Sequence, residues 1–241
     1  MPRHIPSLPT RRLAIGTLAG VALTALVAAA PAKPAAERWS ATISTSPIGA
    51  HLVGKPGAKV KLVEYFSYTC SHCADFAKQS AVPLKTLYID TGLVQFEYRN
   101  LVRDPLDLTA ALLARCGGAR AFVGNHQAIM LAQPTWLGKA AKMTKEQLAP
   151  WYQGSEGERT RRIAADTGLD TLMRGRGYTK AQIDACLDSD VASAEILGMT
   201  NIGQNADRVA ATPSFFINGK NAEVSDWPKL KTRLDLALKG A

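Results

Sequence analysis

The feature that most constrains this chain is a pair of cysteines at C-x-x-C spacing, Cys70 and Cys73, placed where a strand pattern changes into a helical one. Residues 59–66 carry apolar side chains that fall on the two faces of an expected strand. Residues 71–89 carry apolar side chains at helical spacing. A disulfide within C-x-x-C closes a very small ring, which suits a reversible redox pair better than a structural crosslink. At a helix start, free backbone N–H groups and the positive end of the helix dipole favour a thiolate on Cys70.

The remaining cysteine pattern excludes two other uses of C-x-x-C. The chain has four cysteines, and Cys116 and Cys186 stand far apart, so the second C-x-x-C pair of a zinc ribbon is absent. A c-type haem attachment needs His directly after the second cysteine, but Ala74 stands there. We therefore expect no metal and no cofactor besides the redox-active Cys70–Cys73 disulfide.

The first residues have the layout of a secretory signal. Residues 1–12 contain three arginines and no acid, residues 13–30 are uncharged, and Ala30-Pro31-Ala32 offers small residues for cleavage. We expect a signal peptide over residues 1–32, with an approximate cleavage site. An uncleaved membrane anchor is the alternative, and the Arg11-Arg12 pair leaves the Sec and twin-arginine export routes open. Export would place the cysteines in an oxidising compartment.

The charge balance argues against a nucleic-acid-binding protein. The chain has 29 Lys and Arg against 20 Asp and Glu, a formal net charge of +9. Part of this excess lies in the signal, and the rest is scattered along the chain, whereas nucleic-acid-binding modules cluster their charge. We interpret the positive charge as a solvated surface.

The strand and helix patterns divide the rest of the chain into four parts. Residues 33–58 are rich in Pro, Ala, Ser and Gly and predict a linker with one short edge strand. Residues 59–103 predict a strand–helix–strand unit with the C-x-x-C at the start of its helix. Residues 104–210 hold no convincing strand and predict a helical block, and residues 211–241 predict two strands and a final helix.

Within the strand–helix–strand unit, residues 59–66 carry apolar side chains on both faces, which is typical of a central strand. Glu64 is the exception, because it shares a face with Val60 and Leu62. These neighbours predict that the Glu64 carboxyl is buried. Pro83 lies inside the following helix and is expected to kink it.

Local signals mark helix starts and a hairpin in the later parts. Capping boxes occur at residues 144–147 and 179–182, and helices are expected over residues 159–174 and 191–209. Asn218-Gly219 is a strong hairpin signal between an apolar strand at 211–217 and a returning strand at 220–224. Ser225 or Asp226 is expected to cap the last helix.

Two runs of sequence resemble the DsbA family of periplasmic thiol oxidases. They are Val63-Glu64-Tyr65-Phe66-Ser67-Tyr68-Thr69-Cys70-Ser71-His72-Cys73 and Thr212-Pro213-Ser214-Phe215-Phe216-Ile217-Asn218-Gly219-Lys220. The helical block is similar to that family's inserted domain, so the resemblance covers about residues 59–240. It implies an α/β thioredoxin fold with a helical domain inserted between the βαβ and ββα halves. It also implies a periplasmic location.

The resemblance agrees with the chemistry expected of the C-x-x-C motif. Cys70 is expected to be the attacking, more exposed sulfur and Cys73 the buried, resolving one. His72 is expected to lower the pKa of Cys70 through a hydrogen bond or a positive charge. Because a stabilised thiolate favours the reduced form, the disulfide becomes a stronger oxidant. Ser71 stands where the family often has proline, which leaves the strength of this effect open.

Three further site residues come from the resemblance. Glu64 lies six residues before Cys70, where the family carries a buried acid, and a carboxyl there could relay the proton of Cys73 during exchange. Thr212-Pro213 resembles the family's cis-proline loop, so we expect a cis bond there. The Thr212 backbone is then expected to pair with an extended substrate peptide.

Cys116 and Cys186 each lie on the apolar face of an expected helix. In an oxidising compartment we expect them to form a structural disulfide that pins the helical block. Closing a loop of 70 residues could stabilise the fold by about 4 kcal/mol in the chain-entropy model. Two free buried cysteines are the alternative.

The expected function is that of a monomeric protein-disulfide oxidoreductase, a dithiol oxidase that passes its disulfide to unfolded exported polypeptides with free cysteines. By resemblance, a membrane quinone-linked protein would reoxidise it. One alternative is a disulfide isomerase or reductase, although residues 33–58 are too few for the dimerisation domain of the isomerase relatives. Another is a glutathione- or metal-handling protein on the same fold, although only His51 and His126 lie in the body outside the motif.

Overall fold

Strand β3 (Val60–Phe66) lies at the centre of the fold. The computed structural model describes Met1 and residues 38–240, and these residues form a six-stranded sheet in the order β1-β2-β4-β3-β5-β6. Strand β3 runs parallel to β4 (Val94–Asn100) and antiparallel to β5 (Ser214–Ile217). Because both neighbours pair with it, β3 can be apolar on both faces, as its sequence predicts. The expected signal peptide, residues 1–32, lies outside the described residues apart from Met1.

The remaining elements follow the predicted order, β-α-β, helical insertion, β-β-α. Before β4 come η1 (Trp39–Ala41), β1 (Ile43–Thr45), β2 (His51–Val53), α1 (Ser71–Leu84) and the π-helix η2 (Lys85–Ile89). The insertion comprises α2 (Pro105–Ala114), α3 (Ala119–Leu131), α4 (Gln133–Ala140), α5 (Lys145–Leu148), η3 (Ala149–Tyr152), α6 (Glu156–Thr167), α7 (Leu169–Gly175), α8 (Lys180–Leu187) and α9 (Asp190–Asn205). After β5 come β6 (Lys220–Asn221) and α10 (Trp227–Lys239). The thioredoxin fold with a helical insertion is therefore confirmed.

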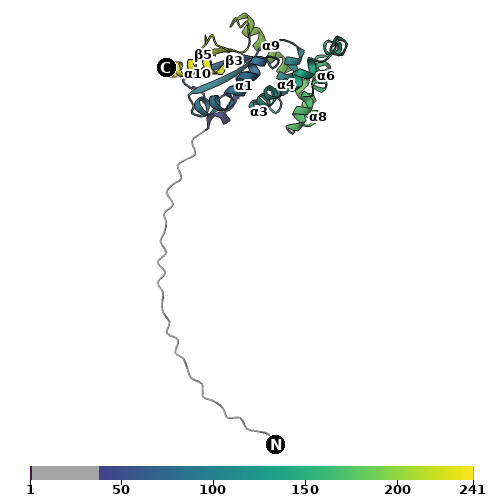
Figure 1. Cartoon of the computed structure of the whole chain (residues 1–241), viewed down its shortest axis with the longest axis horizontal. Helices are drawn as coiled ribbons and strands as arrows, with labels where there is room; N and C mark the ends of the chain where they lie inside the picture. Colours follow the sequence, from purple (N-terminus) through teal and green to yellow (C-terminus); the bar gives the residue numbers. More distant parts are fainter. Residues whose placement is uncertain (2–37, 241) are drawn as a thin grey trace. The chain divides into compact units, whose positions relative to one another are not determined.

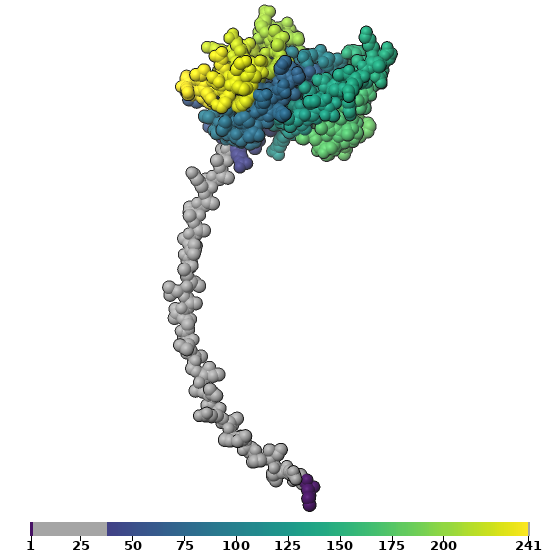
Figure 2. Space-filling model, viewed as in Figure 1, coloured from purple at the N-terminus to yellow at the C-terminus, as the bar shows by residue number. Residues whose placement is uncertain are grey.

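Helices cover both faces of the sheet. On one face, Phe76 of α1 packs against Phe215 of β5 and Trp227 of α10. On the other face, α9 approaches Tyr65 so closely that a Cβ on Gly203 would lie 2.7 Å from the tyrosine ring. Figure 1 shows α4, α6 and α8 grouped at the opposite end of this folded part from β5 and α10. Figure 2 shows the same separation on the surface.

Two expectations about element boundaries need correction. Residues 33–58 were expected to form a linker with one edge strand, but their described part forms η1 and two strands, β1 and β2. The register of β2 against β4, with His51 opposite Tyr98, extends the sheet on that side. The single helix expected over 159–174 is two helices, because Gly168 adopts a left-handed conformation (φ 79°) between α6 and α7.

Candidate active site

The C-x-x-C motif lies at the start of α1. Cys70 is the N-cap residue, with extended backbone angles, and Cys73 lies in the first turn of the helix. Both thiols are free in this structure. Cys70 is 5% exposed and Cys73 is fully buried, so the order of exposure is the expected one, although both sulfurs are well covered.

The cis-proline loop lies against Cys70. The Thr212–Pro213 peptide bond is cis, as the resemblance implies. In its protonated form, the Cys70 thiol donates a hydrogen bond of 3.2 Å to the Thr212 carbonyl oxygen. Thr212 is half-buried and Pro213 is buried. The loop before β5 therefore contacts the first cysteine of the C-x-x-C motif.

The two sulfurs differ strongly in acidity. Hydrogen bonding from the Cys73 thiol, and then from the Thr212 side chain, stabilises the thiolate and lowers the pKa of Cys70 to about 4 despite burial. The backbone N–H of Cys73 and the positive charge of Arg103 act in the same direction. Burial raises the pKa of Cys73 well above its ordinary value, and the hydrogen bond to Cys70 adds to this effect. At neutral pH, Cys70 is therefore the thiolate and Cys73 the thiol.

Glu64 is buried, as its apolar neighbours predict. Its side chain is 2% exposed, and burial raises its pKa well above the ordinary value, with a further contribution from the negative charge of Cys70. The negative charge of an ionised Glu64 in turn adds to the raised pKa of Cys73, after burial and the hydrogen bond to Cys70. Glu64 also borders a cavity of about 280 Å³ between α1, α3 and the sheet, lined further by Phe76, Tyr98 and His126. The Glu64 carboxyl is therefore a buried, protonatable group at the edge of this cavity.

His72 lies differently from the other motif residues. Its side chain is exposed on the first turn of α1, and it forms no side-chain hydrogen bond within the described part of the chain. The structure therefore shows no hydrogen bond from His72 to either sulfur. Its influence on Cys70 remains a prediction.

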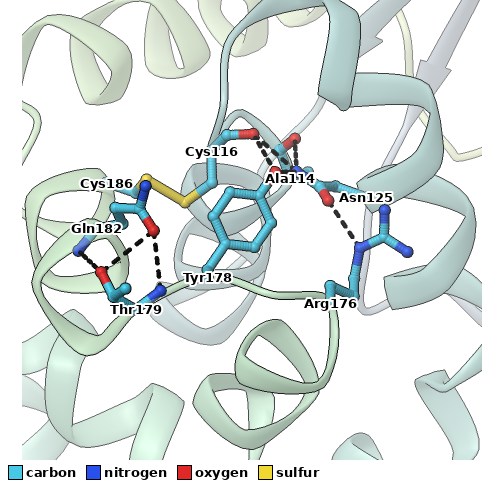
Figure 3. Close-up of a disulfide and its surroundings, with 8 residues drawn as sticks. All are labelled: Ala114, Cys116, Asn125, Arg176, Tyr178, Thr179, Gln182 and Cys186. Carbon is cyan, nitrogen blue, oxygen red and sulfur yellow. Dashed lines mark hydrogen bonds between the residues drawn. A yellow bond between two sulfur atoms is a disulfide. The ribbon is translucent and has the colours of Figure 1, made fainter.

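The remaining cysteine pair lies inside the helical insertion. A disulfide joins Cys116, just after α2, to Cys186 of α8 (Figure 3). The Cys116 carbonyl accepts hydrogen bonds from the Asn125 amide at 2.8 Å and from the Tyr178 hydroxyl at 2.9 Å. The disulfide thus crosslinks helices within the insertion.

Three buried polar residues at this site were missed by the sequence analysis: Asp107, His126 and Gln133. All three come from the insertion and contact the link between β3 and Cys70. The Asp104-Pro105 pair is a recognisable helix start, and it could have indicated a turn near Asp107. For Gln133, we find no signal in the sequence.

Among the described residues, no group of three or more His, Cys, Asp or Glu side chains is placed to hold a metal ion. Within the same part of the chain, every helix is too short or too polar to cross a bilayer.

Comparison with known proteins identifies the family. The sequence model of the family described as Thioredoxin matches residues 46–235. The chain belongs to the thioredoxin family. A crystal structure of a protein-disulfide isomerase from Novosphingobium aromaticivorans is similar over 79% of this chain and 97% of its own, with 37% identity and a TM-score of 0.76. Wolbachia pipientis alpha-DsbA1 shares the fold at 22% identity, with a TM-score of 0.59 over 78% of this chain and 90% of its own.

A curated relative comes from Rickettsia prowazekii and bears the name "Putative protein-disulfide oxidoreductase RP025". It is 30% identical over 188 residues, which cover 78% of this chain and 61% of the relative. A Rickettsia felis relative of the same kind is 30% identical over 78% of this chain and 59% of its own length. The chain thus spans about three fifths of the length of the curated relatives it matches.

Proposed function

We propose that this protein is a thiol–disulfide oxidoreductase that acts as a dithiol oxidase on exported polypeptides. The observation that carries the proposal is the difference between the two sulfurs: an acidic thiol at the N-cap of α1 and a buried thiol of raised pKa behind it. A thiolate stabilised in the reduced form makes the disulfide form a stronger oxidant.

The reaction begins from the Cys70–Cys73 disulfide. A substrate thiolate attacks the Cys70 sulfur, because this is the more exposed of the two, and the Cys70–Cys73 bond breaks. Cys73 leaves as a thiolate inside an apolar setting, where a buried charge is costly, and takes up a proton. Glu64 is the proposed donor, since it is buried, coupled to Cys73 and readily protonated.

The second half of the reaction releases the product. A second substrate thiolate attacks the substrate sulfur of the mixed disulfide, and Cys70 leaves as its stabilised thiolate. The substrate has then lost two electrons and gained a disulfide, and the Cys70–Cys73 pair has gained the two electrons. We propose that a membrane quinone-linked protein removes them, and that the enzyme acts as a monomer.

Substrate orientation would come from the cis-proline loop. The Thr212 carbonyl lies 3.2 Å from the Cys70 sulfur, so an extended peptide pairing with this backbone would place its own cysteine beside Cys70. The signal-like residues 1–32 support action outside the cytoplasm, and the Cys116–Cys186 disulfide is consistent with an oxidising compartment.

A disulfide isomerase is the second candidate, because the relative of 37% identity bears that name. An acidic Cys70 also suits isomerisation, in which the reduced thiolate attacks a wrong disulfide in the substrate. The two functions differ in the form that must predominate: an oxidase starts from the disulfide and an isomerase from the dithiol.

The equilibrium of the Cys70–Cys73 pair with glutathione tests the proposal. We expect a reduction potential above about −150 mV, in the range of strong oxidants. A potential near or below about −230 mV would contradict the oxidase proposal. Refolding of a reduced protein and of a scrambled protein, measured side by side, would then separate oxidase from isomerase activity.

A further inference from the structure

The short link between β3 and Cys70, residues 67–69, has no partner strand or helix of its own. It nevertheless places the reactive sulfur, because Cys70 follows it directly as the N-cap of α1. Ser67 and Tyr68 are fully buried. Buried backbone groups need hydrogen-bond partners, and the N–H and C=O of Tyr68 find theirs in two side chains of the helical insertion.

Asp107 of α2 binds the beginning of the link. Its carboxylate accepts a hydrogen bond of 2.6 Å from the Ser67 hydroxyl and one of 2.7 Å from the Tyr68 N–H. The Arg103 N–H donates a third bond of 3.1 Å to the same carboxylate. Asp107 is fully buried, and three donors converge on it, so its side chain has one defined position.

Gln133 of α4 binds the end of the link. Its amide nitrogen donates to the Tyr68 carbonyl at 2.6 Å and to the Cys70 carbonyl at 2.9 Å. The Cys70 carbonyl also accepts the first backbone bond of α1, from Ala74 at 3.2 Å. Gln133 therefore contacts the same peptide group that begins the active-site helix.

Tyr68 is held at a third point. Its hydroxyl lies 3.0 Å from Nδ1 of His126 in α3, and both side chains are buried. A side chain from each of α2, α3 and α4 thus contacts the N–H, the hydroxyl and the carbonyl of this one residue. The insertion contacts the residues on the sheet side of Cys70, whereas Thr212 contacts the sulfur itself.

We propose that Asp107 and Gln133 are positioning residues for the Cys70 thiol, through which the helical insertion holds residues 67–69 and fixes the sulfur against Thr212 and the first turn of α1. The inference rests on the proposed function in taking Cys70 as the attacking sulfur. The insertion would then contribute to thiol chemistry as well as to the shape of the molecule.

The physical reason is the short range of hydrogen bonds to a thiolate. The Cys73 N–H stabilises the Cys70 thiolate only while the N-cap geometry is kept. If residues 67–69 can rotate, the sulfur spends less time in that geometry, and the thiolate loses stabilisation. The reduced form then becomes less stable relative to the disulfide.

The test compares two matched variants of the full protein. Gln133→Met removes a buried amide that donates to two backbone carbonyls beside Cys70. Asn125→Leu removes a buried amide that donates to the carbonyls of Ala114 and Cys116, next to the structural disulfide (Figure 3). Asn125 also donates to the Tyr178 hydroxyl and accepts from Arg176, so Asn125→Leu loses more hydrogen bonds than Gln133→Met. Only Gln133→Met loses them at the active-site link, so the control is the more severe of the two changes.

We expect Gln133→Met to raise the pKa of Cys70, measured from thiolate absorbance in the reduced protein, by about one unit. The equilibrium constant for oxidising glutathione should fall about tenfold, since one pKa unit is a tenfold change. Asn125→Leu should change neither quantity. The proposal is overturned if Gln133→Met shifts the Cys70 pKa by less than about 0.2 units. It is also overturned if Asn125→Leu shifts the Cys70 pKa by the same amount as Gln133→Met.

Asp107→Asn provides a second variant in case Gln133→Met does not fold. Asparagine keeps the size of the side chain but turns one accepting oxygen into a donor that faces other donors. The same upward shift in the Cys70 pKa is expected, and no shift would contradict the positioning role. A wild-type pKa near 8.5 would contradict the proposed oxidase, whereas the difference between variants would still decide the positioning role.

Discussion

The two thiols of the C-x-x-C motif have opposite pKa shifts. Cys70 lies where α1 has free N–H groups, and Cys73 lies one turn further in, where burial dominates. The low pKa of Cys70 comes first from the hydrogen bond of the Cys73 thiol, then from the Thr212 side chain and from the Cys73 backbone N–H that the N-cap position provides. The sequence predicts this asymmetry, because C-x-x-C at a helix start places only the first cysteine at the N-cap.

The acidity of Cys70 can be measured without its partner sulfur. In a Cys73→Ser variant the serine hydroxyl can still donate to the thiolate, so the pKa of Cys70 should stay near its low value of about 4, within about one unit. Thiolate absorbance against pH gives this value directly. A pKa near 8.5 would show that the N-cap position does not activate the thiol.

Glu64 should influence both the stability of the fold and the rate of thiol–disulfide exchange. Its pKa is raised in the folded state, so its contribution to stability is full below its unfolded value of 4.5 and is lost as the pH rises through the folded pKa. Glu64→Gln should therefore become increasingly stabilising, relative to the wild type, as the pH rises above the unfolded value of 4.5. Unfolding curves at several pH values measure this trend.

The same substitution should slow exchange, because glutamine cannot donate a proton to the leaving Cys73 thiolate. We expect a loss of at least about tenfold in the oxidation rate near neutral pH, given the usual size of general acid catalysis. Stopped-flow oxidation of a dithiol peptide measures the rate. Equal rates for both proteins at every pH would remove Glu64 from the mechanism.

Site residues that are brought in by long-range contacts are harder to predict from the sequence. Glu64 was predicted to be buried because its own strand carries apolar neighbours on the same face. Asp107 and Gln133 reach the active site only because α2 and α4 fold back onto residues 67–69. Apolar spacing and capping residues indicate local structure only. Contacts between distant elements leave no such pattern in the sequence.

At the scale of elements, local capping chemistry was the most informative signal. The boxes predicted at residues 144–147 and 179–182 begin α5 and α8 as expected, and a third at Ser155–Glu158 begins α6. The hairpin at Asn218-Gly219 is also present, although its second strand is shorter than expected and ends at Asn221. The break between α6 and α7 was missed, since apolar spacing continues across Gly168 while the backbone does not.

The disulfide within the insertion should stabilise the fold without taking part in turnover. It joins residues 70 positions apart, so replacing both Cys116 and Cys186 by Ala should lower the free energy of unfolding by about 4 kcal/mol. Oxidation of a dithiol peptide at a temperature where the variant is folded should be unchanged. Lost turnover in the folded variant would show that this pair has a redox role.

At the scale of the whole molecule, buried histidines shape the response to acid. His51 of β2 stacks on Phe122 of α3, with ring centroids 3.7 Å apart, in the segment that was expected to be a linker. Burial, and then the positive charge of Arg115, lowers the pKa of His51 to about 3. Its contribution to stability is therefore full above its unfolded value of 6.5 and is lost as the pH falls toward about 3.

A His51→Phe variant should keep the ring stack and lose this pH dependence. Relative to the wild type, it should gain up to about 3 kcal/mol of stability between pH 7 and pH 4, from about 2.5 pKa units at 1.36 kcal/mol each. Denaturant unfolding at the two pH values measures the difference. An equal change in stability at both values would show that the pKa of His51 is not lowered in the folded protein.

The pairing of β3 with β5 also has a consequence for synthesis of the chain. β3 is made early, but its partner β5 is made only after the whole helical insertion. Until residues 214–217 are available, one edge of β3 has unpaired N–H and C=O groups, which makes this edge prone to aggregation. The Thr212 carbonyl arrives with the same late segment, so Cys70 is made long before the group that lies against it.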